Sequence, residues 1–303
     1  MYFSRIQSNV FFGQITGLRP DDLDLDATLN GGQMFRWSKD DQDGWRGMVG
    51  DRSLRLQQDR PGDPLHYETD ADDAEAFVRD FLRLDDIDLP LAAAGWARGD
   101  ALFAEAWERR PGIRILRQDP DECFFAFLCA SVAPIGRIGG MLRAVAAEYG
   151  TDRGAGYVAF PSAARIAAGS ETRLRELGLG FRARRVIEAA RVLRDLPFGH
   201  LAALRTQVTS AEAQTELRAF FGVGEKIADC VCLFALDNDG AIPVDTHIWR
   251  IAQTRYVPEL AGKTLTSANY ARVTQAFHDR FGPYAGWAQQ TLFYRAAVGR
   301  KTE

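Results

Sequence analysis

The chain has 303 residues, of which 46% are hydrophobic and 26% charged, and its formal net charge at pH 7 is −4. This composition is typical of a globular protein large enough for two domains, so it excludes a disordered chain, and the negative charge disfavours a nonspecific nucleic-acid binder. The N-terminal stretch lacks the apolar core of a signal peptide, and no run of eighteen apolar residues occurs. We therefore expect a soluble cytoplasmic protein with no membrane partner.

The cysteines give no sign of a metal site or a disulfide framework. They stand in apolar helical contexts, without C-x-x-C spacing and without a nearby pair of histidines, at Cys123, Cys129, Cys230 and Cys232. Zinc sites and disulfide scaffolds need closer or more regular spacing. We expect an intracellular protein with reduced thiols and no zinc.

Charge is distributed unevenly along the chain. The segment from Pro20 to Asp100 has 20 acidic and 9 basic residues, whereas the segment from Arg137 to Arg205 has 12 arginines and 6 acidic residues. Arginine has a planar guanidinium that suits phosphates and base edges. A GC-rich genome that favours arginine on helix surfaces explains the same pattern equally well.

In chain order, the first elements are short strands. The stretch FRWSKDDQDGWRGMVGDRSLRLQQD at 35–59 reads as three strands, with a DQDG turn after the first. A helix follows from about residue 71, with Asp72 or Asp73 as its cap. Helical periodicity then dominates from Pro120 onward, at 120–130, 135–150, 162–169, 182–196 and 266–282.

These elements predict an α+β fold. An N-terminal antiparallel sheet domain with helices would occupy residues 1–112, and a larger helical domain would occupy residues 113–303, with the boundary in the segment 111–119. No internal repeat occurs, and no heptad pattern suggests a dimer, so we expect a monomer.

The stretch FGVGEKIADC at 221–230 predicts a hairpin between two helices. Glycine takes positive φ without steric cost, so a glycine on each side of a valine allows a sharp turn that turns its N–H groups outward. These N–H groups and the positive end of the second helix would bind a phosphate oxygen. Lys226 falls in the first turn of that helix, where the dipole and any burial disfavour a charged ammonium, and a neutral lysine is a nucleophile. A solvated surface lysine is the plainer alternative.

A second segment, AIPVDTHIWRI at 241–251, places Asp245 between an apolar Ile-Pro-Val and a helical run. A lone aspartate in this position is normally a helix N-cap. The same carboxylate, on a short loop after the helix of Lys226, could also face that lysine across a cleft. An amine and a carboxylate arranged in this way can attack a sugar carbon and stabilise the cationic sugar while a base departs.

These two segments resemble the helix-hairpin-helix DNA glycosylase superfamily (HhH-GPD), and within it the chain resembles the 8-oxoguanine DNA glycosylase/AP lyases. Further similarity lies in NGGQMFRW (30–37), GIRILRQDPDECFFAFLCAS (112–131), LGLGFRARRV (177–186) and FGPYAGWAQQTLF (281–293). The resemblance implies a bifunctional base-excision enzyme acting on duplex DNA that contains oxidised guanine, active in the cytoplasm at a bacterial nucleoid. Lys226 would attack C1′ of the damaged nucleotide and hold the sugar as a Schiff base, whose β-elimination nicks the strand, with Asp245 assisting.

The resemblance also implies the residues that recognise the lesion and the DNA. The Gly32 carbonyl would accept the N7–H that 8-oxoguanine has and guanine lacks, Phe293 and Cys230 would sandwich the ring, and Gln289 would bond its Watson–Crick edge. The opposite cytosine would be read by Arg137 and Arg182, with Phe181 as an aromatic wedge, although Arg182 could also be a solvated charge. Phosphates would be held by His247 and by the hairpin backbone at Gly222, Val223 and Gly224. No cofactor is required and no iron–sulfur cluster is expected, but the family leaves open an alkali cation bound by hairpin carbonyls.

One segment departs from the family pattern. Where the family commonly has an asparagine triplet, this chain has Val132, Ala133 and Pro134, which have no side-chain hydrogen-bond donors. We therefore expect weaker discrimination of the opposite base, and the sequence leaves open a wider pocket that admits other oxidised or alkylated purines. The alternatives to this function are a glycosylase for alkylated or other oxidised purines, which Lys226 disfavours, and a noncatalytic DNA-binding protein, which gives no reason for Lys226 and Asp245 to occur together.

Overall fold

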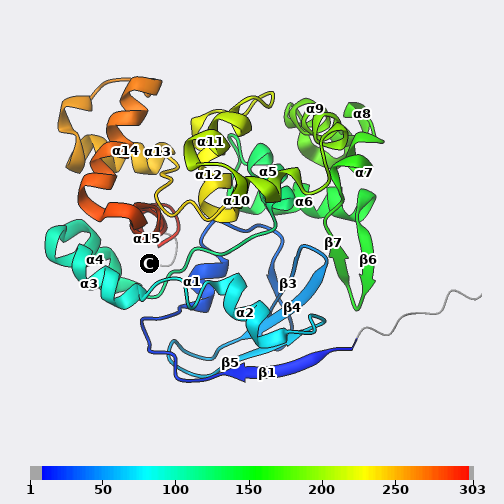
Figure 1. Cartoon of the computed structure of the whole chain (residues 1–303), viewed down its shortest axis with the longest axis horizontal. Coiled ribbons are helices and arrows are strands. Elements are labelled where there is room, and N and C mark those ends of the chain that lie inside the picture. The colour runs from blue at the N-terminus through cyan, green and yellow to red at the C-terminus, as the bar shows by residue number, and fades with distance from the viewer. Residues whose placement is uncertain (1–8, 300–303) are drawn as a thin grey trace, which may run out of the picture.

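The computed structural model describes residues 9–299 and has a sheet below two groups of helices (Figure 1). The sheet is antiparallel and five-stranded, in the order β1-β5-β4-β3-β2. Its strands are β1 (Phe11–Ile15), β2 (Ser38–Lys39), β3 (Trp45–Val49), β4 (Arg52–Gln57) and β5 (Leu65–Thr69). Gly47 on β3 pairs with Leu54 on β4, and Leu54 pairs with Thr69 on β5. Gly50 lies in the short turn between β3 and β4 with φ +60°, a conformation that favours glycine.

One face of this sheet packs against helices α1 (Leu25–Leu29) and α2 (Ala74–Leu82). The alternation of side chains along each strand puts Leu54 and Leu56 in the core, where both are fully buried. Trp37, which precedes β2, stacks on Phe81 of α2 with ring centroids 5.4 Å apart. The sheet region therefore has a core of its own.

The helical part has a second and larger core. Its α-helices are α3 (Leu89–Gly99), α4 (Ala101–Arg109), α5 (Pro120–Cys129), α6 (Ile135–Tyr149), α7 (Ala163–Ala167), α8 (Glu171–Leu174), α9 (Arg182–Asp195), α10 (His200–Gln207), α11 (Ser210–Arg218), α12 (Glu225–Ala235), α13 (Thr246–Ile251), α14 (Ser267–Phe281) and α15 (Ala285–Ala297). Between them lie two π-helical segments, η1 (Arg175–Leu179) and η2 (Ala252–Tyr256), two 3₁₀ turns, η3 (Pro258–Leu260) and η4 (Gly282–Tyr284), and a small hairpin of β6 (Thr151–Gly154) and β7 (Tyr157–Ala159).

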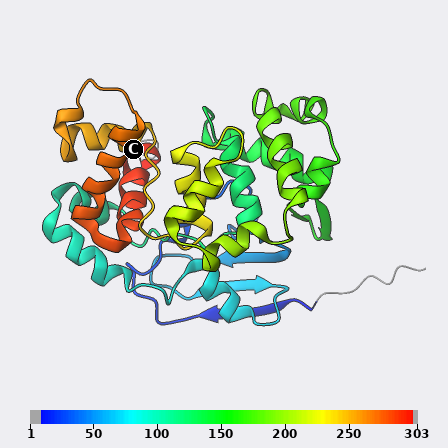
Figure 2. The same cartoon turned by 45° about the horizontal axis from the view of Figure 1, so that its top comes forward.

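The helices form two groups that both views separate (Figures 1 and 2). One group contains α5 to α12, and the other contains α13 to α15 together with α3 and α4. Within this second group, Trp96 joins α3 to α14 and α4. Its indole N–H donates to the Phe281 carbonyl at 3.0 Å, and its ring contacts Phe103 of α4 edge to face. Helices α3 and α4 precede residue 113 and nevertheless pack in the helical core. The expected domain boundary between residues 112 and 113 stays a prediction.

The α+β fold class is confirmed. The three strands expected between residues 35 and 59 are present as β2, β3 and β4, and the helices expected from Pro120 onward are present as α5, α6, α7, α9 and α14. Asp73 is the N-cap residue of α2, but its side chain makes no capping hydrogen bond. The β6–β7 hairpin and helices α3 and α4 were not predicted. No helix within residues 9–299 is long and apolar enough to cross a membrane.

Candidate active site

A cleft of about 720 Å³ opens where the two groups of helices meet. Five segments line it: the turn at 32–35, the connection between α5 and α6, helix α12, the start of α13, and α15. The cleft brings together most of the residues expected to act on the base, namely Gly32, Lys226, Cys230, Asp245, His247, Gln289 and Phe293. Residues that are up to 261 positions apart in the sequence therefore line one cavity.

Lys226 lies in the first turn of α12, as the sequence predicts. Gly224 is the N-cap residue and has no side chain to cap the helix, so the positive end of the helix stays open beside the lysine. The ammonium lies 5.1 Å from the centroid of the Phe127 ring. It also bonds the thiol of Cys230, one helical turn further on. The half-buried amine is thus held between an aromatic face and a thiol at the wall of the cleft.

Cys230 is buried, and burial raises the pKa of its thiol to about 11, although the nearby Lys226 ammonium acts in the opposite direction. The charge of Asp245 raises that pKa further. Lys226, Cys230 and Asp245 all line the same cleft. Cys230 is therefore a neutral thiol in the wall that the two charged groups share.

Asp245 caps α13 and also lines the cleft. Its Oδ1 accepts hydrogen bonds from the N–H groups of His247, at 3.0 Å, and Ile248, at 2.9 Å. Its Oδ2 takes part in no hydrogen bond among residues 9–299. Asp245 therefore has the N-cap role expected from the sequence, and the same residue lines the cleft.

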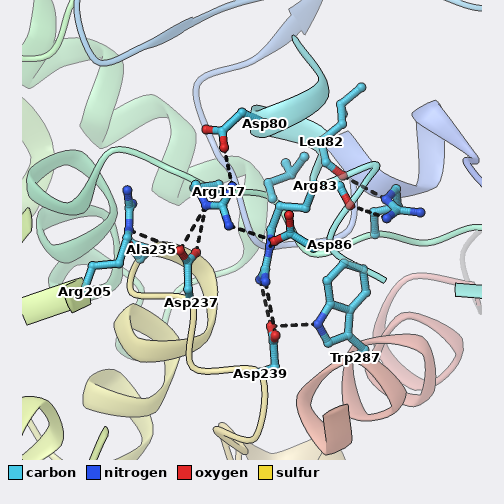
Figure 3. A network of polar contacts seen from close by, with 12 residues as sticks. Asp80, Leu82, Arg83, Asp86, Arg117, Arg205, Ala235, Asp237, Asp239 and Trp287 are labelled. Carbon is cyan, nitrogen blue, oxygen red and sulfur yellow. Dashed lines mark hydrogen bonds and ion pairs between the residues drawn. The ribbon is translucent and has the colours of Figure 1, made fainter. Parts of the chain in front are cut away.

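The loop that leads from α12 to Asp245 is held by ion pairs from distant parts of the chain (Figure 3). Arg117 donates to Asp237 at 3.0 Å. Arg83, at the end of α2, donates to Asp239 at 2.8 Å, and the Trp287 indole donates to the same carboxylate at 2.8 Å. The sheet domain therefore fixes the first half of the loop that carries Asp245.

Gly32 lies directly on the aromatic wall of the cleft. Its φ is +76°, and a Cβ there would lie 3.2 Å from the Phe293 ring and 3.3 Å from Ile135. Within the part of the chain that the structure describes, the Gly32 carbonyl has no hydrogen-bond partner. The position therefore requires glycine, both for its backbone conformation and for the space beside Phe293.

Two buried glutamines fix the Gly32 turn, and the sequence analysis missed both. The Gln290 amide donates to the Gly31 carbonyl at 2.9 Å. The Gln33 amide donates to the Arg114 carbonyl at 2.8 Å and accepts from the Leu116 N–H at 3.0 Å. The available signal was an amide side chain directly beside each predicted pocket residue, in GGQ and in AQQ.

Gln289 has a buried amide oxygen without a protein partner in the wall of the cleft. Only 2% of this residue is exposed, and its Oε1 has no hydrogen-bond partner among the described residues. An unpaired buried amide oxygen costs about 1–3 kcal/mol, so such groups are usually satisfied by a ligand or water. Across the cleft, the His247 ring meets Phe293 edge to face, with centroids 5.9 Å apart. The cleft thus combines an aromatic wall with an unpaired hydrogen-bond acceptor, the amide oxygen of Gln289.

An exposed aromatic side chain lies beside the cleft, next to a buried arginine. Gly178, with φ +91°, and Gly180, with φ +57°, form the turn that leaves Phe181 half exposed. Arg182 is itself buried, and its guanidinium lies 4.3 Å from the Phe181 ring centroid. Burial lowers the pKa of Arg182, and the charge of the exposed Arg137 lowers it further, so the two arginines are neighbours.

Arg182 also supports the connection between α5 and α6. Its Nε donates to the Ser131 carbonyl at 2.9 Å, and its Nη2 donates to the Val132 carbonyl at 2.8 Å. Val132 is 92% exposed and has φ +52°, an unusual conformation for a β-branched residue. The plain alternative for Arg182, a solvated helix charge, is therefore wrong, because its guanidinium is a buried structural support.

The hairpin between α11 and α12 differs in detail from the expectation. Gly222 has φ +83°, as expected, but Gly224 has φ −98° and ψ −179°, an extended conformation that any residue adopts. Only Gly222 therefore needs positive φ, and the expectation that Gly224 needs it too is wrong. The Val223 N–H donates to the Phe220 carbonyl at 3.1 Å, inside the turn. Among the described residues, the N–H groups of Gly224 and Glu225 have no partner, and they face the open end of α12.

The described residues contain no cluster of three or more His, Cys, Asp or Glu side chains that could hold a metal ion. In the hairpin, the carbonyls of Phe220 and Gly224 already accept backbone N–H groups, at 3.1 and 3.0 Å. The alkali cation expected at the hairpin carbonyls stays a prediction.

Comparison with known proteins agrees with this geometry. Residues 17–124 match the N-terminal domain of 8-oxoguanine DNA glycosylase, and residues 134–276 match the HhH-GPD superfamily of base excision DNA repair proteins. The N-glycosylase/DNA lyase OGG1 of Arabidopsis thaliana is 38% identical over 93% of this chain and 79% of its own length. The N-glycosylase/DNA lyase of Saccharomyces cerevisiae is 30% identical over 95% of this chain and 87% of its own length.

Solved structures show the same similarity. The 8-oxoguanine glycosylase/lyase of Clostridium acetobutylicum, in complex with double-stranded DNA containing cytosine opposite 8-oxoguanine, superposes with a TM-score of 0.80 and 25% identity. The alignment covers 92% of this chain and 93% of that one. A 3-methyladenine DNA glycosylase of Archaeoglobus fulgidus, with a TM-score of 0.72 and 18% identity over 94% of this chain and 99% of that one, shares the fold.

Proposed function

Because this chain belongs to the family of 8-oxoguanine N-glycosylase/DNA lyases within the HhH-GPD superfamily, we propose that it excises 8-oxoguanine from duplex DNA and nicks the strand at the resulting site. The observation that carries this proposal is the cleft that Lys226, Cys230 and Asp245 line together with the Phe293 ring. The enzyme is a base-excision-repair glycosylase and lyase, and its partner is double-stranded DNA.

The reaction begins with a base outside the helix stack, because its sugar is not accessible inside a duplex. The nitrogen of Lys226 attacks C1′, and the bond from C1′ to the base breaks with its electrons going to the base. The carboxylate of Asp245 would lie near the sugar, where its negative charge stabilises the positive charge that develops there. The cap bonds on Oδ1 hold this carboxylate in place, so the stabilisation requires no reorganisation.

Strand cleavage follows from the same lysine. The sugar ring opens as the nitrogen of Lys226 forms a Schiff base with C1′, and loss of a proton from C2′ then breaks the bond from C3′ to the phosphate oxygen. Water hydrolyses the Schiff base and returns the free amine. A carboxylate beside the lysine can also move protons in these steps.

Selection of the oxidised base rests on unpaired groups of the cleft. The free carbonyl of Gly32 would accept the N7–H of 8-oxoguanine, whereas guanine has a lone pair at N7 and would leave the carbonyl unpaired. The unpaired Oε1 of Gln289 would accept from the Watson–Crick edge. Phe293 and Cys230 would contact the two faces of the ring.

DNA binding would use the groups around the cleft. The open N–H groups at the start of α12, the backbone of Gly222 and His247 would bind phosphates, while the Val223 N–H is already paired within the turn. Arg137 with Arg182 would lie near the opposite base. Phe181 would act as the wedge that keeps the duplex kinked. An alkali cation at the hairpin would be held by backbone carbonyls and would supply charge next to a phosphate. Binding by phosphate contacts weakens as salt rises.

The test compares three duplexes under single-turnover conditions: one with 8-oxoguanine opposite cytosine, one with an alkylated purine, and one undamaged. We expect base release and strand cleavage only with the first, and binding without either step for Lys226→Gln. Release of the alkylated base alone would make the chain an alkylation-repair glycosylase. Binding without release of any base would make it a noncatalytic DNA-binding protein.

A further inference from the structure

Tyr270, on α14, contacts the end of the loop that carries Asp245. Only 5% of Tyr270 is exposed. Its hydroxyl oxygen accepts from the Val244 N–H at 3.1 Å and lies 2.9 Å from the Ile242 carbonyl. Val244 directly precedes Asp245, so the hydroxyl fixes the backbone one residue before the catalytic carboxylate.

The same hydroxyl reaches the helix that carries Lys226. It lies 2.5 Å from Oδ2 of Asp229, which is 4% exposed and is three residues after Lys226 on α12. The other oxygen of Asp229 accepts from the Gln214 amide of α11 at 2.6 Å. A chain of buried hydrogen bonds therefore joins α11, α12, α14 and the loop of Asp245.

The number of protons available determines which groups donate in this series of hydrogen bonds. A tyrosine hydroxyl has one proton and two lone pairs, but here it has three partners. If Asp229 is protonated, it donates to the hydroxyl oxygen, and the tyrosine proton is free to bond the Ile242 carbonyl, so every partner is satisfied. Burial raises the pKa of Asp229 to about 6, which brings the protonated form within reach near neutral pH.

We propose that Tyr270 and Asp229 are positioning residues that hold the Asp245 carboxylate in register with the Lys226 amine. This inference rests on the proposed function of those two groups. A shift of about 1 Å in a catalytic group can lower a rate by about a hundredfold, so fixing the loop backbone beside Asp245 has a direct effect on catalysis.

The first test is Tyr270→Phe, which removes only the hydroxyl. We expect base release in single turnover to fall by about 10- to 100-fold, while the dissociation constant for the duplex changes by less than about twofold. Tyr149→Phe is the matched control, because the Tyr149 hydroxyl has no hydrogen-bond partner among the described residues. That variant keeps the wild-type rate.

A second set of variants separates positioning from general destabilisation. In an Asp245→Asn background, Tyr270→Phe should lower the rate by less than about threefold, because the group that it positions is gone. Asp229→Asn, which can donate to the hydroxyl as the protonated acid does, should keep most of the activity, and Asp229→Ala should not. An equal loss from Tyr270→Phe in both backgrounds, or no loss in either, would overturn the proposal.

A readout without catalysis distinguishes failure of this inference from failure of the proposed function. Hydrogen exchange of the Val244 amide should speed up in Tyr270→Phe and stay unchanged in Tyr149→Phe. If wild type releases no 8-oxoguanine but this difference is present, the proposed substrate is wrong and the loop contact holds. If the Val244 amide exchanges equally in both variants, the loop contact itself is refuted.

Discussion

At the scale of single residues, Asp245 separates stability from catalysis within one side chain. The residue caps α13 through Oδ1 and also lines the cleft, and Oδ2 has no hydrogen-bond partner among the described residues. Asparagine caps helices as well as aspartate does but has no negative charge. We therefore predict that Asp245→Asn changes the free energy of unfolding by less than about 0.5 kcal/mol and lowers the rate of base release by about a hundredfold or more. Urea denaturation and single-turnover excision measure the two effects, and a large loss of stability would contradict the division of roles.

Val132 is the second residue whose two properties can be separated. Its left-handed backbone costs about 1 kcal/mol for a residue of this kind, and asparagine tolerates that conformation better. We predict that Val132→Asn raises stability by about that amount, and that the same change in Val192, an exposed valine within helix α9, does not.

Val132 also leads to a prediction about specificity for the base opposite the lesion. Val132 has no donor for an opposite base, so wild type should excise 8-oxoguanine at comparable rates opposite cytosine and opposite adenine. Val132→Asn should raise the preference for cytosine. A wild-type preference for cytosine above about a hundredfold would refute the idea that this position sets the discrimination.

At the scale of elements, the hairpin between α11 and α12 has two glycines with different requirements. A Cβ at Gly222 would lie 2.5 Å from the Arg185 side chain, on a backbone with φ +83°, whereas a Cβ at Gly224 meets open space. We predict that Gly222→Ala lowers stability by about 1–2 kcal/mol and weakens duplex binding, and that Gly224→Ala has little effect on stability. Thermal unfolding and fluorescence anisotropy measure these changes, and equal effects of the two substitutions would contradict the described turn.

At the scale of the whole molecule, the sheet domain is tied to the catalytic loop by buried charges. Arg83 is 2% exposed, and Asp239 on the loop accepts two of its hydrogen bonds. Arg83 also pairs with Asp86 at 2.6 Å, so removing Asp239 leaves the buried guanidinium with one carboxylate in place of two. We predict that Asp239→Ala costs about 3 kcal/mol of stability, whereas Glu148→Ala, which breaks an exposed pair with Arg173, costs about 1 kcal/mol or less. Chemical denaturation of both variants measures the difference, and similar losses would mean that the loop is not held from the sheet domain.

The parts of the fold and site that depend on neighbouring residues could be predicted from the sequence, whereas those that depend on contacts between distant segments could not. The strands at 35–59 and the helix of Lys226 follow from periodicity, and the cap role of Asp245 follows from its place before a helical run. The packing of α3 and α4 in the helical core could not be predicted, because it depends on contacts such as that of Trp96 with Phe281, 185 residues away. The buried contacts of Gln33, Gln290, Asp229 and Tyr270 also join distant segments, so no local pattern distinguishes these polar residues from solvated ones.

The central claim is that Lys226 becomes covalently bound to the sugar of the damaged nucleotide. The most direct measurement is borohydride reduction of wild type and Lys226→Gln on a duplex with one 8-oxoguanine opposite cytosine. We predict a stable protein–DNA adduct with wild type and none with the variant. Release of the base by wild type without any adduct would refute covalent catalysis, because water rather than Lys226 would then be the nucleophile.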